Sequence, residues 1–185
     1  MTEHHAAVCP IALAGHLDGT IRRWFQNPRR LLEPWVREGM TAMDFGCGPG
    51  FFTPDLARLV GPSGRVVAVD LQAGMLERVR LKLRGTDLAS RVTLHQSAPD
   101  RIGLTAPVDF ALVFYVLHEL PDQAAFFSEL RPLLSPDARV LAVEPPLHVS
   151  RAAFEATLRR AHEARFRLAD RPRIRFQKAA LLAPA

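Results

Sequence analysis

The 185-residue chain is predicted to fold as a doubly wound α/β domain, and three features of the sequence support this prediction. From residue 41 onward, short apolar runs of strand length alternate with segments whose apolar residues recur at helical spacing. The runs are continuously apolar, which is typical of parallel strands buried on both faces. A glycine-rich turn follows the first run, at the place where such sheets bind ligands.

Each element is predicted from its own local pattern. The strands are expected at 41–45, 65–69, 92–96, 108–116, 139–143, 166–174 and 176–183. Helices are expected at about 19–26, 28–36 and 73–84, and after the capping residues Thr53, Asp122 and Ser150. Residues 1–40 mix prolines with arginine pairs and are predicted as an N-terminal helical segment or lid, followed by the main domain at 41–185.

Composition excludes several classes of protein. No apolar run approaches the roughly 18–20 residues of a membrane span, and the N-terminus has no pattern of a secretory signal. Cys9 and Cys47 are the only cysteines, so a disulfide scaffold is excluded and a reducing cytoplasm is expected. The net charge of +5 comes largely from residues 151–178, a basic excess that suits a solvated face, nucleic acid or another anion.

The strongest functional signal is the loop Asp44-Phe45-Gly46-Cys47-Gly48-Pro49-Gly50, which lies between a strand and a helix. Asp70 ends the next strand, where an acidic side chain accepts hydrogen bonds from ribose hydroxyls. Phe51 stands where a dinucleotide fingerprint has its third glycine, and Asp44 would repel a pyrophosphate while attracting an ammonium group. S-adenosylmethionine (SAM) fits, because it has a ribose, a cationic amino-acid arm and no phosphate.

The sequence at this point resembles the class I SAM-dependent methyltransferases, above all the small-molecule branch of ubiquinone/menaquinone C-methyltransferase-like proteins. The resemblance covers about residues 35–185 and is carried by AMDFGCGPGFF (42–52), VVAVDLQAGML (66–76), FYVLHELPD (114–122), ELRPLLSPDARVLAVEP (129–145) and FQKAALLA (176–183). It implies a Rossmann-like, seven-stranded and mostly parallel sheet in the order 3-2-1-4-5-7-6, with the last strand antiparallel. It also implies methyl transfer to a small-molecule acceptor by in-line displacement.

The resemblance further implies which residues bind the cofactor. These are Asp44, Phe45, Gly46, Cys47, Gly48, Gly50, Asp70, Leu71, Ser97, Ala98 and Phe114. Asp44 would hold the ammonium group, Asp70 the ribose and Leu71 the adenine ring. Ser97 departs from the pattern, because many relatives have Asp there to accept from the adenine amine.

Candidate catalytic residues follow the fourth and fifth strands. They are Tyr115, His118, Glu119, Glu144 and His148. Three interpretations are open: His118 or His148 acts as a general base or orients the acceptor, the set binds a divalent metal, or the side chains only shape the loop and pocket. No resident metal is expected.

Two other functions remain open. An RNA methyltransferase would use the basic excess, although base-amine methyltransferases carry a proline-containing motif that is absent at Phe114–His118. A non-catalytic SAM-binding module would bind the cofactor without turnover. Nucleic acid is not expected as a partner, a homodimer is compatible with the sequence, and the role of Cys9 with its neighbouring histidines is open.

Overall fold

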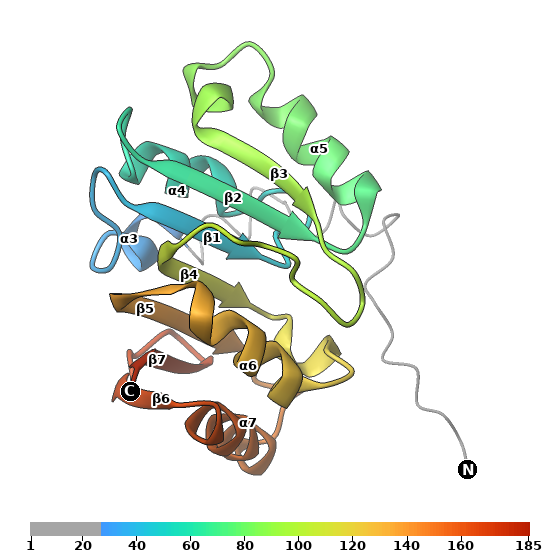
Figure 1. Ribbon diagram of the computed structural model, residues 1–185, viewed down its shortest axis with the longest axis vertical. Helices are drawn as coiled ribbons and strands as arrows, with labels where there is room; N and C mark the ends of the chain where they lie inside the picture. The colour runs from blue at the N-terminus through green and yellow to red at the C-terminus, as the bar shows by residue number, and fades with distance from the viewer. Residues whose placement is uncertain (1–26) are drawn as a thin grey trace.

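The protein is built on one seven-stranded sheet in the computed structural model, which describes residues 27–185 (Figure 1). The strands are β1 (Thr41–Phe45), β2 (Arg65–Asp70), β3 (Val92–Gln96), β4 (Val108–Phe114), β5 (Leu134–Glu144), β6 (Phe166–Asp170) and β7 (Lys178–Pro184). The α-helices are α3 (Pro28–Leu32), α4 (Thr53–Leu59), α5 (Ala73–Leu83), α6 (Gln123–Leu133) and α7 (Arg151–Glu163). Two 3₁₀ turns are η2 (Asp87–Arg91) and η3 (Leu117–Glu119).

The sheet order is β3-β2-β1-β4-β5-β7-β6, which confirms the predicted topology. Strands β1 to β5 pair in parallel, whereas β7 runs antiparallel to both β5 and β6. The order reverses at β1, which pairs with β2 on one side and β4 on the other. In an open sheet of this kind, a ligand site is expected beyond the carboxyl ends of the strands at this reversal.

Two apolar cores cover the two faces of the sheet. Because successive side chains of a strand point to opposite faces, Leu112 of β4 belongs to one core and Val113 to the other. The first core contains residues of α3, α4 and α5, and the second contains residues of α6 and α7. Figure 1 shows α6 in front of the sheet and α4 behind it. This double burial explains the continuously apolar strand sequences.

Two of the three predicted helix caps are confirmed. Asp122 accepts hydrogen bonds from the backbone N–H groups of Ala124 and Ala125 at 2.9 Å each, and Ser150 accepts from Ala153 at 3.1 Å. The predicted cap at Thr53 is wrong. Phe52 is the capping residue of α4, without a side-chain hydrogen bond, and Thr53 is the first residue of the helix.

Several predicted boundaries also differ. Helix α3 ends at Leu32 rather than residue 36, because Pro34 has no N–H to continue the helical hydrogen bonds. Strand β4 ends at Phe114 because Tyr115 adopts a left-handed backbone with φ of 63°. Strand β5 begins earlier than predicted, at Leu134, which pairs with Val108.

The last two strands are shorter at their facing ends than predicted. Strand β6 ends at Asp170, and β7 begins at Lys178. The intervening segment contains Phe176, whose φ of 60° breaks the extended backbone. The predicted helix at 19–26 lies outside the described residues, and the proposed lid at 1–40 lies mostly outside them.

Candidate active site

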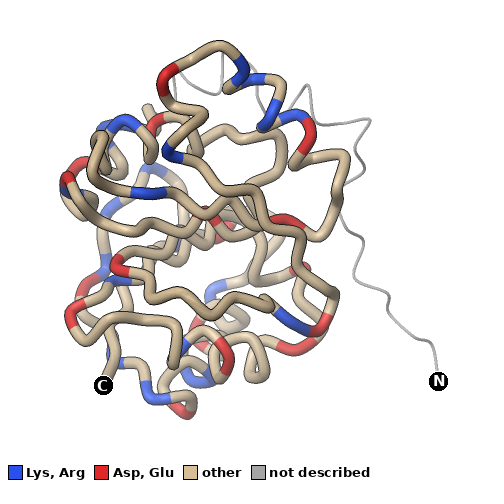
Figure 2. Tube along the Cα trace, turned by 45° about the horizontal axis from the view of Figure 1, so that its top comes forward, with Lys and Arg blue, Asp and Glu red and all other residues tan. Residues whose placement is uncertain are grey.

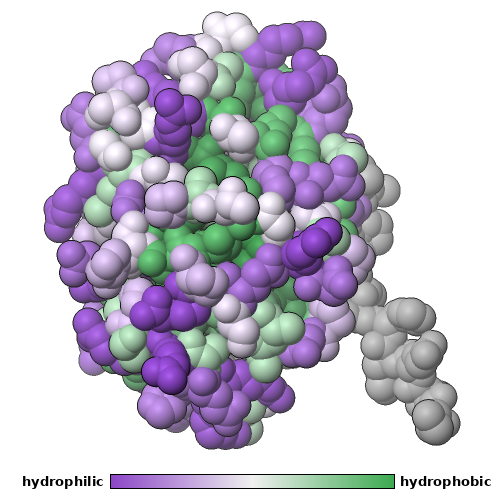
Figure 3. All heavy atoms as spheres, in the orientation of Figure 1, coloured by the Kyte–Doolittle hydropathy of each residue, from purple (hydrophilic) through white to green (hydrophobic). Residues whose placement is uncertain are grey.

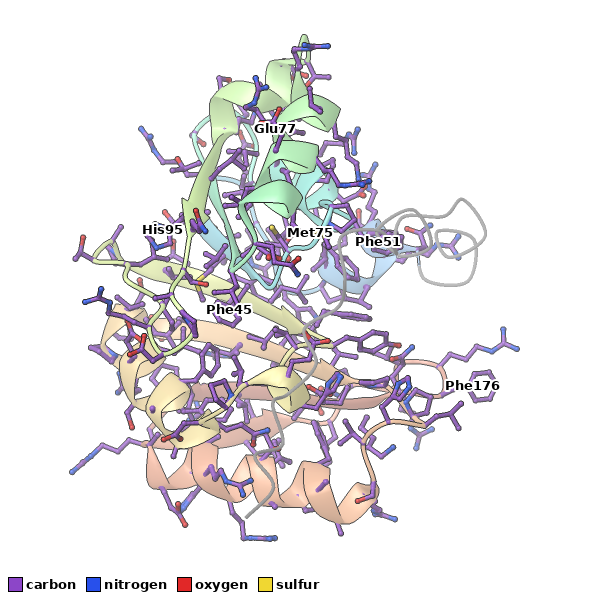
Figure 4. The ribbon with its side chains drawn as sticks, turned by 90° about the vertical axis from the view of Figure 1, so that its right-hand side faces the viewer. Phe45, Phe51, Met75, Glu77, His95 and Phe176 are labelled. Carbon is purple, nitrogen blue, oxygen red and sulfur yellow. The ribbon has the colours of Figure 1, made fainter. Side chains whose placement is uncertain are left out.

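A cleft of about 810 Å³ lies at the carboxyl ends of the central strands. Its walls come from the glycine loop, the ends of β2 and β4, the loop after β3, and the segments leading into α6 and following β5. In Figure 4 the viewer faces this edge of the sheet, with Phe45 and Met75 in the middle of the molecule. Figure 3, in the orientation of Figure 1, shows hydrophobic residues near the centre of the molecule, bordered by hydrophilic residues.

The glycine loop turns sharply at three residues with positive φ, namely Gly46 (68°), Gly48 (52°) and Gly50 (76°). A Cβ added at Gly46 would lie 2.7 Å from a methyl carbon of Val116, so glycine is required for close packing. A Cβ added at Gly48 would meet nothing within 4 Å. The backbone of Gly48 therefore stands open toward the cleft, where a ligand can approach it closely.

Asp70 holds the loop from the end of β2. Its Oδ2 accepts the N–H of Gly48 at 2.8 Å, and its Oδ1 accepts the N–H of Gln72 at 2.9 Å. Burial raises the pKa of the Asp70 carboxyl, while these backbone hydrogen bonds counteract the shift. Each carboxylate oxygen keeps acceptor capacity after one such bond, so Asp70 can still bind ribose hydroxyls.

Asp44 is buried at the carboxyl end of β1, with 2% of its surface exposed. The Thr53 hydroxyl donates to Asp44 Oδ2 at 2.6 Å, which is why this side chain does not cap α4. Burial raises the pKa of Asp44 to about 7; the Thr53 bond and the Lys82 ammonium lower it, and the Asp70 charge raises it. Asp44 is thus a carboxyl whose ionisation an incoming cation would favour.

Apart from Gly50, which does not line the cleft and faces Val79 of α5, the remaining predicted cofactor residues also lie at the cleft. Phe45, Cys47, Leu71, Ser97, Ala98 and Phe114 all line it. Burial raises the pKa of the Cys47 thiol well above its usual range, so the thiol stays protonated and acts as a small packing residue. The Ser97 N–H donates to the Asp70 carbonyl at 3.1 Å, which joins the start of the β3–β4 loop to the end of β2.

Two predicted catalytic residues form a hydrogen-bonded pair across β4 and β5. His118 Nδ1 lies 2.5 Å from Glu144 Oε2, and this bond is the main cause of the raised pKa of His118. Glu144 is only 1% exposed and does not line the cleft, whereas His118 does. Among the described residues nothing bonds to Glu144 Oε1. Glu144 therefore has a hydrogen-bonded link to the cleft through His118.

The other three predicted catalytic residues line the cleft beside this pair. The rings of His118 and His148 are nearly parallel, with centroids 6.5 Å apart. Burial is the main cause of a raised pKa at Glu119. The Tyr115 hydroxyl donates to Gln177 Oε1, which holds the tyrosine against the segment before β7.

The described part of the chain contains no group of three His, Cys, Asp or Glu side chains arranged to hold a metal ion. None of its helices is long and apolar enough to cross a membrane. Cys9 and its neighbouring histidines lie outside these residues.

Sequence reasoning missed several residues that support the site. Lys82 of α5 donates to the Gly50 carbonyl at 2.9 Å, and Val116 packs against Gly46. Glu129 of α6 accepts the N–H groups of Ile102 and Gly103 at 2.8 and 2.9 Å, and so shapes the β3–β4 loop. No local pattern marks these contacts, because the partners are 26 or more residues apart in the chain.

Comparison with known proteins gives the family. Residues 42–137 match the family described as "Methyltransferase domain", just over half of the chain. A demethylmenaquinone methyltransferase of Lactobacillus johnsonii is 33% identical over 127 residues, which are 68% of this chain and 51% of that protein. A ubiquinone/menaquinone biosynthesis C-methyltransferase of Pasteurella multocida is 30% identical over 110 residues, 59% of this chain and 41% of that protein.

The fold has a near match among solved structures. A SAM-dependent methyltransferase from Aquifex aeolicus superimposes with a TM-score of 0.84 at 24% identity, covering 95% of this chain and 98% of that one. The chain spans about half the length of the curated relatives it matches. On the combined evidence of sequence match, strand order and cleft, the chain belongs to the methyltransferase domain family and has the class I, SAM-dependent methyltransferase fold.

Proposed function

We propose that the protein transfers a methyl group from SAM to a small-molecule acceptor within the 810 Å³ cleft. One observation carries the proposal. A single cleft joins two carboxylates at the ends of β1 and β2 to an imidazole at the end of β4, and Glu144 orients that imidazole from β5. The part of the cleft with the two carboxylates suits a cationic nucleoside. The part with the imidazole suits an acceptor group that gives up a proton.

The residues of the glycine loop fit SAM. Asp70 retains acceptor capacity for a ribose diol, and Gly48 leaves open backbone beside it. Asp44 lies at the base of the loop, where a ligand ammonium would stabilise its ionised form. Two carboxylates would repel a pyrophosphate, so this loop disfavours a dinucleotide. When bound, SAM supplies an electrophilic methyl group on a sulfonium.

His118 is proposed as the general base. The bond from Nδ1 to Glu144 leaves Nε2 as the ring nitrogen that can take a proton from the acceptor. The Glu144 carboxylate fixes the tautomer and stabilises the imidazolium that forms. His148 and Tyr115 are proposed to orient the acceptor beside it, and Glu119 to favour the charged imidazole. The cleft aligns the reactants and limits the access of water to them.

The acceptor is proposed to be a flat aromatic molecule with an ionisable hydroxyl. Phe52, Phe114, Tyr115 and Phe126 supply aromatic rings to the cleft, which suits stacking on a planar ring. A protonated hydroxyl also gives a reason for a base, because removing its proton creates the nucleophile. The names of two relatives, a demethylmenaquinone and a ubiquinone/menaquinone methyltransferase, support a quinol-type acceptor.

Other sequence predictions remain part of this proposal. We propose that the reaction takes place in the cytoplasm and that residues 1–40 form a lid. A homodimer is compatible with the sequence. Basic and acidic segments are interspersed over the described trace (Figure 2), which supports a small-molecule rather than a nucleic-acid substrate.

Calorimetry and a methyl-transfer assay test the proposal together. SAM and S-adenosylhomocysteine should bind in the micromolar range and NAD far more weakly, because of the two loop carboxylates. Transfer of labelled methyl from SAM should require a reduced naphthoquinone or a related phenol. Comparable NAD binding would overturn the cofactor assignment. SAM binding without transfer to any phenol would indicate a binding module, and transfer to RNA would indicate the rival enzyme class.

A further inference from the structure

Two large apolar side chains stand out on the surface beside the cleft. Among the described residues, Leu147 is 93% exposed and Phe176 is 76% exposed, against 46% and 45% for the next two, Leu81 and Leu168. Exposing two large apolar side chains to water in one region is energetically unfavourable, so the region is a candidate contact surface.

The two side chains lie in neighbouring loops. Strands β5 and β7 are antiparallel with Glu144 opposite Lys178, so the residues after Glu144 run alongside the residues before Lys178. Lys178 Nζ also donates to the Pro146 carbonyl at 3.0 Å, which ties the loops together. In Figure 4, Phe176 projects outward from the margin of the face that holds the cleft. Its left-handed backbone, at φ of 60°, is an unusual conformation for a bulky residue.

Positive charge surrounds these side chains. The segment 171–178 carries four basic residues and no acidic one. Arg171 forms an ion pair with Glu155 at 2.7 Å, whereas Arg173 and Arg175 are exposed. Arg173 lines a depression of about 350 Å³ together with Arg151, the first residue of α7, and with the paired Glu155 and Arg171. The Arg175 guanidinium lies 5.0 Å from the centre of the Phe176 ring.

We infer that this rim patch, formed by Leu147, Arg151, Arg173, Arg175 and Phe176, docks the protein on the surface of an anionic lipid bilayer. Leu147 and Phe176 enter the boundary between headgroups and acyl chains, and the arginines bind lipid phosphates around them. The depression beside Arg173 is the place for one such phosphate. The inference concerns binding alone and does not depend on the acceptor proposed above.

The composition of the rim patch favours a bilayer over RNA. A protruding leucine cannot stack on a base, whereas it can insert among acyl chains beside an aromatic ring. The position also suits a lipid surface. Leu147 precedes His148, which lines the cleft, and Gln177 next to Phe176 accepts a hydrogen bond from Tyr115. A docked protein would therefore place its cleft mouth near the membrane surface.

Co-sedimentation of the full chain with lipid vesicles tests the inference. The protein should bind vesicles of phosphatidylcholine with added phosphatidylglycerol, and should bind pure phosphatidylcholine much more weakly. The double variant R173Q/R175Q should lower the partition coefficient roughly 25-fold, at about fivefold per arginine. The double variant L147S/F176N should lower it by about tenfold or more. Asparagine at 176 keeps the left-handed backbone, because this residue adopts positive φ readily.

The matched control is R78Q/L81S on α5, which removes one exposed arginine and one exposed leucine elsewhere. It should bind anionic vesicles as the unchanged protein does, and all variants should keep the same melting temperature and SAM affinity. If L147S/F176N proves unstable, R173Q/R175Q still tests the inference. The inference is overturned if the unchanged protein ignores anionic vesicles, if the control loses as much binding as the patch variants, or if only RNA binding responds to them.

Discussion

The two halves of the cleft are built in different ways. The cofactor half is made of a short, continuous loop whose backbone is set by glycines and anchored by Asp70 through the Gly48 N–H. The acceptor half is made of side chains from separate strands, and its central pair joins residues 26 positions apart. Backbone geometry written into one segment can be recognised from sequence, whereas a meeting of distant side chains depends on strand order.

Each half of the cleft has a buried carboxylate, and the two carboxylates differ in their bonding partners. Asp44 has no cation bonded to it among the described residues, and burial raises its pKa to about 7. Glu144, at 1% exposure, has the His118 imidazole as a partner at 2.5 Å. The first carboxylate is therefore suited to receive a charged ligand, and the second is suited to hold a catalytic side chain in place.

The largest effect is expected at His118. Replacing it with alanine should lower turnover about 10²–10⁴-fold, because the proposed base is lost, while SAM affinity measured by calorimetry stays nearly unchanged. Turnover of the unchanged protein should rise with pH through a His118 pKa that Glu144 raises above its ordinary value, since the base works unprotonated. In Glu144→Gln that midpoint should move to lower pH. A variant at His118 with normal turnover would remove the acceptor half from catalysis.

Asp44 should produce the next largest effect, in the stability of the ligand-free protein. Its folded pKa is raised, so its contribution is fully present below the unfolded value near 4 and is lost as pH rises through about 7. Asp44→Asn should therefore be roughly 3 kcal/mol more stable relative to the unchanged protein at pH 8 than at pH 4. Denaturant unfolding at the two pH values measures this difference, and parallel pH profiles would contradict it.

Replacing Asp70 tests the ribose contact in the cofactor half. Asp70→Ala should weaken SAM binding by about 1.5–3 kcal/mol, the scale of charge-assisted hydrogen bonds. Calorimetry gives the affinity, and Asp87→Ala on the exposed turn η2 is a control that should leave it unchanged. If Asp70→Ala bound SAM as before, the ribose would have to lie elsewhere.

The smallest expected effect is the difference in stability between alanine variants at Gly48 and Gly46 of the glycine loop. Alanine at Gly48 should cost roughly 1–2 kcal/mol of stability for its left-handed backbone, and it should weaken SAM binding because the new methyl group enters the cleft. Alanine at Gly46 should destabilise the protein further, because it must also displace Val116. Thermal unfolding compares the two variants. Equal stability would mean that Val116 moves aside without cost.

Much of the fold was accessible from local sequence patterns. Continuous apolar runs located the seven strands, and Asp122 and Ser150 marked helix starts through their short-range hydrogen bonds. Thr53 showed the limit of such patterns. It has the residue type and position of a cap, but its hydroxyl bonds to Asp44, which is nine residues earlier in the chain and buried. Leaving the buried Asp44 carboxylate without its hydrogen-bond donor would cost more free energy than leaving a solvated helix end without a side-chain cap.

The sequence by itself determined the glycine loop, the acidic residue at the end of β2 and the topology implied by their resemblance. Their signals are local, because turns, caps and strand faces depend on residues close together in the chain. Only the tertiary structure decided that Glu144 bonds to His118 behind the cleft wall and that the loops of Leu147 and Phe176 lie side by side. Those contacts follow from the pairing of β5 with β4 and β7. The residues of one strand indicate that the strand is buried, but they do not specify which strands pair with it or in which register.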